Sequence, residues 1–454
     1  MWSQMIKSYL YCKKRNGCDI VNRSWKKSFC VLIALVASIS TWGAASGDTD
    51  EENFSLGIFG NANMDETIDE QDMVYVQEVI LGTKPATNLA DANYDGKIDA
   101  DDITWIEQII RGEEKELTII DDAGDVITFQ KPINRVVLIE GYAALYETWR
   151  ALNMKDKVTG INDRYVRPDG IRYSERYYPE LTTKKNVGST EEPDLEVIAN
   201  IAPDIFFIDW SPMYGMKEKL AKSLPQLPAV CMDITYENFT RNTRMTGYIF
   251  DKREEAEEYI NWRNGLKDTI EKQTKGLPDD KRPSVFLSSY EPGINDFPAR
   301  GGSRYDPLVD GAGGKNICEG LIGLPTANKV SAEWILKQNP DVIIFTASNA
   351  YTGFEFNSND PSKLAALYED FMNRSEFSEI DAVKNKRVYF ICLPWLLYGG
   401  ASGIITEAYF AKWIQPDLSN DIDPLAIHQK FLELQGVDLD LEKYGVFVYP
   451  PLEK

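Results

Sequence analysis

The hydrophobic pattern after residue 117 alternates between two kinds of segment. Short apolar runs such as RVVLI and DIFFID are separated by stretches whose apolar residues recur at helical spacing, such as AALYETWRALNM. Alternating strands and helices predict a parallel sheet with both faces covered. At the start of the region, TIIDDAGDVITF predicts a β-hairpin. The apolar runs that predict strands lie at 135–139, 158–162, 204–209, 229–234, 284–290, 341–347 and 387–393.

One long polar stretch interrupts this alternation. The segment FDKREEAEEYINWRNGLKDTIEKQTKG is rich in Glu and Lys and contains no Pro, so it predicts a single exposed helix over 251–275. We therefore predict an α/β protein with two parallel-sheet lobes, at 117–250 and 283–454, joined by that helix. A bilobed protein of this kind can hold a ligand in the cleft between its lobes.

Two similar acidic segments precede the alternating region. NANMDETIDEQD begins at Asn61 and DANYDGKIDADD begins at Asp91, and each runs into a helix-patterned stretch that ends at Gly. Oxygen-bearing side chains recur at loop positions 1, 3, 5, 9 and 12, and the backbone carbonyl of position 7 would complete the ligand set of a hard cation such as calcium. The alternative, a solvated acidic turn before a helix, is weakened because the pattern occurs twice in register. The predicted ligands of the two calcium sites are Asn61, Asn63, Asp65, Thr67, Asp69 and Asp72, then Asp91, Asn93, Asp95, Lys97, Asp99 and Asp102.

Residues 55–116, which contain both loops, resemble a dockerin, a small all-α module of paired EF-hand-type calcium loops. The resemblance implies structural calcium and a cohesin-like module as a partner. The second loop has Gly96 at the sharp turn, whereas the first has Glu66 there and Asn61 in place of Asp, so we expect the first site to be weaker. We also expect calcium removal to unfold this module alone and to spare ligand binding by the lobes.

Composition and charge narrow the range of partners and the location of the protein. The chain has 454 residues and a formal net charge of −22, which argues against a nucleic-acid partner. Basic residues followed by FCVLIALVASISTWGAA within 1–46 indicate a signal peptide or, alternatively, a retained membrane anchor. We therefore expect an extracytoplasmic protein, secreted or anchored at the outer face of the membrane. The cysteines after the leader have no metal-binding spacing and are expected to be buried thiols: Cys231, Cys318 and Cys392.

The order of motifs in the lobes resembles that of one class of transport proteins. NVGSTEEPDLEVIANIAPDIFFID is followed by YDPLVDGAGGKNICEG and then by VSAEWILKQNPDVIIF. Over about 117–450 the chain is similar to the helix-hinged, class III substrate-binding proteins of iron–siderophore and cobalamin ABC importers. The resemblance implies two lobes braced by a rigid helix, capture of a ferric siderophore or related metal chelate in the cleft, and delivery of the chelate to an ABC permease.

Two carboxylates match motifs of that family. Glu196 falls in the first-lobe motif DLEVIANIAPD, and Glu333 falls in the second-lobe motif VSAEWILKQNPD. The resemblance implies that each glutamate faces the permease and meets an Arg of the transporter, which would fix the docking orientation. The alternative is that each only adds favourable negative charge near the start of a helix.

The cargo-binding residues are predicted from their position after strand ends. Such residues face the ligand crevice of a parallel sheet. Aromatic faces suit flat chelators, and Arg pairs with anionic oxygens. Each residue taken singly has ordinary packing as its alternative, but together they predict a bulky anionic cargo. The candidates are Tyr142, Arg164, Tyr165, Trp210, Tyr214, Tyr290, Arg300, Arg304, Tyr305, Trp395 and Tyr398.

Other functions are weighed against this one. A corrinoid or haem cargo is the alternative within the same type of protein. Capture of a bare transition metal is disfavoured because His428 is the only histidine in the chain. We expect no enzyme, since the sequence has no nucleophile elbow, phosphate loop or zinc-protease motif. The alternatives of another class are a dockerin-bearing carbohydrate-active enzyme and a cell-surface adhesion module.

Overall fold

The computed structural model describes residues 54–141, 144–168, 174–209, 215–302, 305–321, 329–347, 356, 358–392 and 400–452. The predicted leader lies outside these residues. None of the helices in the described ranges is both long and apolar enough to cross a membrane.

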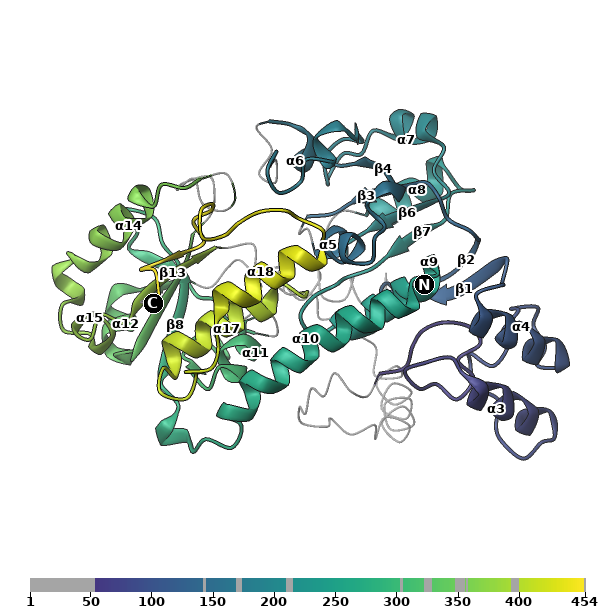
Figure 1. Cartoon of the computed structure of the whole chain (residues 1–454), viewed down its shortest axis with the longest axis horizontal. Coiled ribbons are helices and arrows are strands. Elements are labelled where there is room, and N and C mark those ends of the chain that lie inside the picture. The colour runs from purple at the N-terminus through teal and green to yellow at the C-terminus, as the bar shows by residue number, and fades with distance from the viewer. Residues whose placement is uncertain are drawn as a thin grey trace, which may run out of the picture. The chain divides into compact units, whose positions relative to one another are not determined.

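The first lobe is built on a five-stranded parallel sheet, as the alternating pattern predicts (Figure 1). Its strands are β3 (Val136–Ile139), β4 (Val158–Ile161), β5 (Lys185–Asn186), β6 (Ile205–Ile208) and β7 (Ala229–Cys231), in the spatial order β5-β4-β3-β6-β7. Strands β3 and β6 are buried along their whole length, which explains their continuous apolar sequences. The helical elements of this lobe are α5 (Ala144–Ala151), η1 (Lys155–Lys157), α6 (Asp163–Val166), η2 (Leu181–Thr183), α7 (Leu195–Ile201) and α8 (Met216–Ser223).

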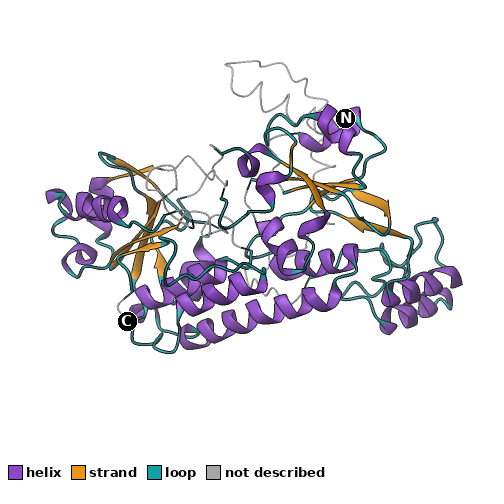
Figure 2. Ribbon diagram, turned by 45° about the horizontal axis from the view of Figure 1, so that its top comes forward, coloured by secondary structure: helices purple, strands orange, loops and turns teal. Residues whose placement is uncertain are grey.

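The second lobe contains another five-stranded sheet, visible as a separate group of strands in Figure 2. Its strands are β8 (Ser284–Ser289), β10 (Lys315–Asn316), β12 (Val342–Ala347), β13 (Val388–Cys392) and β14 (Val448–Tyr449), in the order β10-β8-β12-β13-β14. All neighbours pair in parallel except β14, which runs antiparallel to β13. A separate antiparallel pair joins β9 (Asp296–Pro298) to β11 (Lys329–Ser331). The helical elements are η3 (Asp279–Lys281), α11 (Asp306–Gly311), α12 (Ala332–Gln338), α14 (Ser362–Met372), η4 (Ser375–Phe377), α15 (Asp381–Lys384), α17 (Gly403–Ile414) and α18 (Pro424–Leu434).

In the sequence, two consecutive helices connect the first sheet to the second. Helix α10 (Arg253–Thr274) has 22 residues and falls within the long polar stretch. It packs against α9 (Phe239–Phe250) and against α11 and α17 of the second lobe. Helix α9 is not predicted by its sequence, FTRNTRMTGYIF, which is rich in Thr and contains Gly and Asn, all weak helix formers. Burial of all but two of its twelve residues supplies the stability that propensity does not.

Side chains from the two lobes also meet directly. The hydroxyl of Tyr236 donates a hydrogen bond to the carboxylate of Glu407 on α17. Arg263 of α10 donates to the backbone carbonyl of Tyr236 at 2.9 Å, and its guanidinium lies 4.2 Å from the centroid of that ring. Elsewhere the ring of Tyr177 stacks on Phe356 with 3.9 Å between centroids. These contacts brace the lobes in addition to α10.

The buried Glu407 makes stability depend on pH. Burial raises its pKa from 4.5 to about 8. Because the folded state then binds the proton more tightly than the unfolded state, stability should fall as the pH rises from about 4.5 to about 8. We expect Glu407→Gln to remove this slope and to raise the free energy of unfolding at about pH 8 by on the order of 3 kcal/mol. Urea unfolding of both proteins at about pH 5 and about pH 8 measures the difference, and an equal pH slope in both would contradict the assignment.

The N-terminal part of the described chain contains two loop–helix units and a hairpin. Helices α3 (Glu70–Ile80) and α4 (Ala100–Arg111) pack against each other, and each begins with a capping box in which an Asp accepts from the backbone of its first turn. Helix α4 ends at Gly112, whose φ of 68° suits glycine, as its sequence predicts. The predicted hairpin forms between β1 (Glu116–Ile120) and β2 (Val126–Gln130).

The loop–helix units share one hydrophobic cluster with the first lobe. Buried Ile68 and Ile106 belong to the same cluster as Tyr248 of α9. The backbone amide of Ile68 donates to the Tyr248 hydroxyl at 2.9 Å, and Arg253, the first residue of α10, donates to the carbonyl of Ile109 in the last turn of α4 at 2.6 Å. Packing is therefore continuous across residue 116, which argues against the expectation that 55–116 unfold independently.

Candidate functional site

The carboxyl ends of strands in the first sheet are joined by polar contacts. Asn162, after β4, donates its side-chain amide to the carbonyl of Glu140 at 2.9 Å. Asp209, after β6, accepts from the backbone amide of Gly141 at 2.6 Å. Since Glu140 and Gly141 follow β3, three neighbouring strands end at one ordered polar edge, where a parallel sheet places its ligand site.

A fully buried carboxylate, Glu140, lies at this edge. One of its oxygens accepts from the backbone amide of Tyr146 at 3.2 Å. Burial raises its pKa well above the ordinary value, and the negative charge of Asp209 adds to that shift. Glu140 is not among the residues predicted from the sequence, although an acid directly after the buried strand RVVLI is a signal that could have identified it.

Arg164 lies at the same edge, which agrees with its predicted place after β4. Its guanidinium donates to the carbonyl of Gly141 at 3.2 Å and to the Thr190 hydroxyl at 3.3 Å. The carboxylate of Glu191 is 3.9 Å away. The side chain stays 27% exposed, so Arg164 is both held in place and accessible from solvent.

Tyr165 is placed differently from the prediction. Its side chain is fully buried, and its ring packs edge-on against Tyr178 with 5.6 Å between centroids. The Tyr165 hydroxyl partly offsets the rise that burial causes in the pKa of the Glu140 carboxyl. Because the ring is turned into the core of the lobe, it presents no face to a cargo, and the predicted ligand contact is not supported.

Arg300 lies at the carboxyl edge of the second sheet. It donates to the hydroxyl of Ser289, the last residue of β8, at 2.7 Å, and to the hydroxyl of Tyr305 at 3.2 Å. The Ser289 hydroxyl is in turn 2.8 Å from that of Thr346 on β12. The Arg300 side chain is half-buried, its Nε is buried without a hydrogen-bond partner, and it forms no ion pair with any described carboxylate. Among the described residues, it is therefore a cation held only by neutral groups.

The tyrosines predicted in this lobe are buried. Tyr290 is 2% exposed within a cluster that includes Phe345 and Phe371, and its hydroxyl donates to Asp370. Tyr305 is 5% exposed and supports Arg300 through its hydroxyl. Direct stacking of cargo on either ring is thus not supported, because both rings are buried.

The remaining predicted cargo residues follow strand ends but lie outside the described part of the chain: Tyr142, Trp210, Tyr214, Arg304, Trp395 and Tyr398.

Glu196 and Glu333 occupy equivalent positions in the two lobes. Each is the second residue of a seven-residue helix, α7 or α12, and each side chain is exposed. The helix starts are capped in the same way, with the Asp194 carboxylate accepting from Val197 at 3.0 Å and the Ser331 hydroxyl accepting from Trp334 at 3.3 Å. Neither glutamate forms an ion pair with a described residue, so both carboxylates are available to a partner.

The second acidic loop is folded around its own carboxylates. The two oxygens of Asp91 accept from the backbone amides of Asp95 at 3.0 Å and Gly96 at 2.9 Å. Asp95 accepts from Lys97 at 2.9 Å, and Gly96 has a φ of 89° that favours glycine. The oxygen atoms of positions 1 and 5 are thereby turned toward the loop interior.

The first acidic loop forms a different set of hydrogen bonds. The side-chain amide of Asn61 donates to the carbonyls of Leu56 at 2.8 Å and Asp65 at 2.6 Å, while its own oxygen is buried without a hydrogen-bond partner. Glu66, at the position of the expected glycine, pairs with Arg244 of α9 at 3.1 Å. Within the described residues, no three His, Cys, Asp or Glu side chains are grouped as a metal site, so any cation here would also need Asn and backbone oxygens.

His428 and two of the cysteines are buried. Burial lowers the pKa of His428 to about 3, and its ring packs against Phe447. Cys231 and Cys318 are buried free thiols, as predicted, and burial raises the pKa of each to about 12.

Comparison with known proteins agrees with this architecture. The chain is 24% identical over 264 residues to the petrobactin-binding protein YclQ of Bacillus subtilis, which covers 58% of this chain and 76% of that protein. It is 22% identical over 204 residues to the Fe(3+)-citrate-binding protein YfmC of the same organism. That match covers 45% of this chain and 58% of the relative. The crystal structure of the TroA-like periplasmic binding protein FepB from Veillonella parvula superposes with a TM-score of 0.59 at 19% identity, covering 73% of this chain and 98% of that one.

A family model described as "Periplasmic binding protein" matches residues 141–392, which is more than half of the chain and includes four of the five strands of each sheet and the helix α10 between the sheets. The chain therefore belongs to the family of periplasmic binding proteins.

Proposed function

We propose that this protein captures a ferric chelate outside the cytoplasm, of the siderophore or ferric-citrate type, and delivers it to an ABC permease. Its family is one of solute-binding transport components, and the two Bacillus subtilis relatives are named for binding petrobactin and ferric citrate. The residues at the strand ends fit an anionic cargo, because Arg164 and Arg300 bring a cation to the carboxyl edge of each sheet.

Arg300 carries this proposal. A half-buried guanidinium without a carboxylate partner among the described residues retains donors that an anionic chelate can accept. Ser289 and Tyr305 fix its direction without cancelling its charge. A neutral corrinoid would make no use of this charge, which is why we favour a ferric chelate.

Arg300→Gln should weaken ferric-chelate binding by about 10- to 100-fold, because it removes charge-assisted hydrogen bonds worth about 1.5–3 kcal/mol. Tryptophan fluorescence measures the affinity with ferric citrate, a ferric catecholate, a ferric hydroxamate, haem and cobalamin as ligands. Arg135→Gln is the control, since Arg135 is 52% exposed and its one ion pair within the described ranges is with Asp204 at the surface. Equal affinities of wild type and Arg300→Gln, or binding of cobalamin alone, would contradict the proposal.

We further propose that Glu196 and Glu333 are the contacts with the permease. Their equivalent positions, exposure and lack of described ion-pair partners support this assignment. The charge near a helix start is the competing explanation, but a stabilising charge alone does not require both residues at the same position of equivalent helices.

We propose that residues 55–116 form a dockerin-like module and hold calcium, chiefly in the second loop. The oxygens of Asp91, Asn93, Asp95, Asp99 and Asp102, with the Lys97 carbonyl, suit a hard cation, which would neutralise the crowded carboxylates. The first loop, with Asn61, Asn63, Asp65, Asp69, Asp72 and the Thr67 carbonyl, supports a weaker site. Its buried and unpartnered Asn61 oxygen favours a cation, but the Asn61 amide hydrogens point at loop carbonyls. The predicted cohesin-like partner has no support among the contacts of the chain and stays a prediction.

Calcium should raise the melting temperature by a few degrees relative to protein in EDTA, since a ligand at 100 times its Kd adds about 2.7 kcal/mol of stability. Asp91→Asn, which gives the second loop the residue of the first, should remove most of this increase. Glu113→Gln, an exposed acid just after α4, is the matched control and should keep it. Differential scanning fluorimetry measures all three proteins, and a melting temperature unaffected by calcium in the wild type would refute the calcium assignment.

A further inference from the structure

A cavity of about 610 Å³ lies away from the carboxyl-edge arginines, where three parts of the chain meet. Gly57 and Leu89 line it from the loop–helix units, Asp122 from the turn between β1 and β2, and Arg241 and Met245 from α9. Neither Arg164 nor Arg300 contributes to its lining. Its volume is in the range of small-molecule sites, and no role in the proposed ferric-chelate transport requires it.

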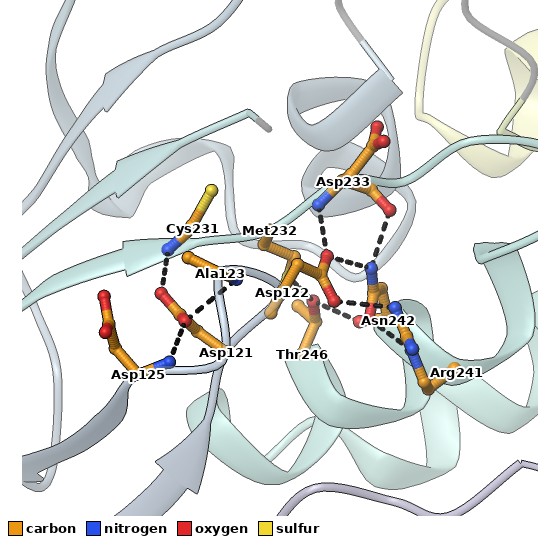
Figure 3. A network of polar contacts seen from close by, with 10 residues as sticks. All are labelled: Asp121, Asp122, Ala123, Asp125, Cys231, Met232, Asp233, Arg241, Asn242 and Thr246. Atoms are coloured by element: carbon orange, nitrogen blue, oxygen red, sulfur yellow. Dashed lines mark hydrogen bonds and ion pairs between the residues drawn. The ribbon is translucent and has the colours of Figure 1, made fainter. Parts of the chain in front are cut away.

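Two of the three carboxylates that line the cavity, those of Asp121 and Asp122, are already compensated (Figure 3). Asp121 accepts from the backbone amide of Cys231 at 2.8 Å and pairs with Lys217. Asp122 pairs with Arg241 at 2.6 Å and accepts from Asn242 at 2.7 Å. With both charges paired and their oxygens engaged, Asp121 and Asp122 offer a ligand few free hydrogen-bond acceptors.

The polar groups of the cavity wall that remain free to bind a ligand are mainly hydrogen-bond donors. Arg241 uses one terminal nitrogen for Asp122 and its Nε for Asn242, while its other terminal nitrogen has no hydrogen bond to a described residue. Its side chain is 32% exposed. Figure 3 shows the carboxylate of Asp233 pointing away from Arg241, so it does not take up that donor. The side-chain amide of Asn238, also in the lining, makes no hydrogen bond within the described chain.

The rest of the wall is apolar. Leu89 and Met245 are only 2% and 4% exposed, and Ile120 is half-buried. Met64 lines the cavity while 42% exposed, so a flexible thioether stands at its boundary with solvent. Methionine side chains adapt to apolar ligands of different shape.

We propose that this cavity binds a small molecule with one carboxylate and an apolar body, its carboxylate on Arg241 and its apolar part against Leu89, Met64 and Met245. The free terminal nitrogen of Arg241 can donate a charge-assisted hydrogen bond to a carboxylate. A single negative charge is favoured over a phosphate, because Asp121 and Asp122 would repel the second charge.

Methionine-methyl NMR of the calcium-loaded full chain tests this site directly, with hexanoate, hexanamide and hexylamine as probes that differ only in their head group. Hexanoate should shift the Met64 and Met245 signals, assigned from Met→Leu variants, at concentrations at least about 10-fold below those needed for the amide. Arg241→Gln should abolish this preference. Arg135→Gln, which removes a half-exposed cation that does not line the cavity, should leave it intact.

A second variant tests the site independently, in case Arg241→Gln does not fold. Asn88 is exposed at the cavity and makes no described hydrogen bond, so Asn88→Trp should block the cavity without touching Arg241 and should abolish the hexanoate shifts. Equal responses to hexanoate and hexanamide, a preference for hexylamine, or no shift of either methionine would each overturn the proposal. Ferric-citrate binding by Asn88→Trp should be unchanged, which separates this site from the cargo site.

Discussion

Replacing both Glu196 and Glu333 by Ala should abolish uptake of the ferric chelate while leaving its affinity for the purified protein unchanged. Each carboxylate is exposed at the second position of a capped helix, one in each lobe, and is not used by any described ion pair. Two charge-assisted contacts of about 1.5–3 kcal/mol each are enough to change permease affinity by more than about 100-fold. The single variants should each lose part of the uptake, because either lobe can still dock.

The assay is uptake of radiolabelled ferric chelate by cells carrying the cognate permease and the variant as their only binding protein. Glu218→Ala with Glu369→Ala is the matched control, since it removes one exposed glutamate from a different helix of each lobe. Full uptake by the Glu196/Glu333 double variant would refute the docking role. Loss of chelate affinity in that variant would instead place the two residues in cargo binding.

The folding of the lobes follows closely from the hydrophobic pattern. The mostly apolar runs become the central strands β3, β6, β12 and β13, because strands covered on both faces need apolar residues at most positions. The two-residue strands β5, β10 and β14 were not predicted, because two residues are too few to show a hydrophobic periodicity. Helix α9 escapes it because burial, rather than helix propensity, stabilises it.

The candidate site is predictable in position but not in orientation. A residue after a strand end is placed at the carboxyl edge, as found for Arg164 and Arg300. The direction of its side chain depends on neighbours that are remote in sequence, such as Phe345 and Phe371 around Tyr290. The local sequence pattern therefore does not predict whether a residue after a strand end is exposed, like Arg164, or buried, like Tyr290. Glu140, which is buried, was not predicted for the same reason.

The contact between the loop–helix units and the first lobe could not be predicted from the sequence pattern either. It depends on Lys131, whose ammonium pairs with Glu114, lies 2.6 Å from Asp251 and donates to the carbonyl of Tyr248 at 2.8 Å. The side chains of Lys131 and Glu114 are only 2% and 1% exposed. Burial raises the pKa of Glu114, and the Lys131 charge opposes that shift. Three chain segments, after α4, after β2 and at the end of α9, thus meet at one buried cation.

We expect Lys131→Met to destabilise the protein by about 3–5 kcal/mol, because it leaves the Glu114 carboxylate buried without its partner. The double variant Lys131→Met with Glu114→Gln should recover most of this loss, since removal of both charges avoids the uncompensated one. Lys84→Met is the control: its pair with Glu78 is 44% and 38% exposed, so the change should cost less than about 1 kcal/mol.

Urea unfolding followed by tryptophan fluorescence measures these free energies, and hydrogen exchange shows which segments open together. Because Ile68, Ile106 and Tyr248 share one cluster, exchange in α4 and α9 should accelerate together in Lys131→Met. Acceleration confined to α3 and α4 would restore the view that residues 55–116 unfold on their own. A loss equal to that of Lys84→Met would show that the buried cation is not what joins the module to the lobe.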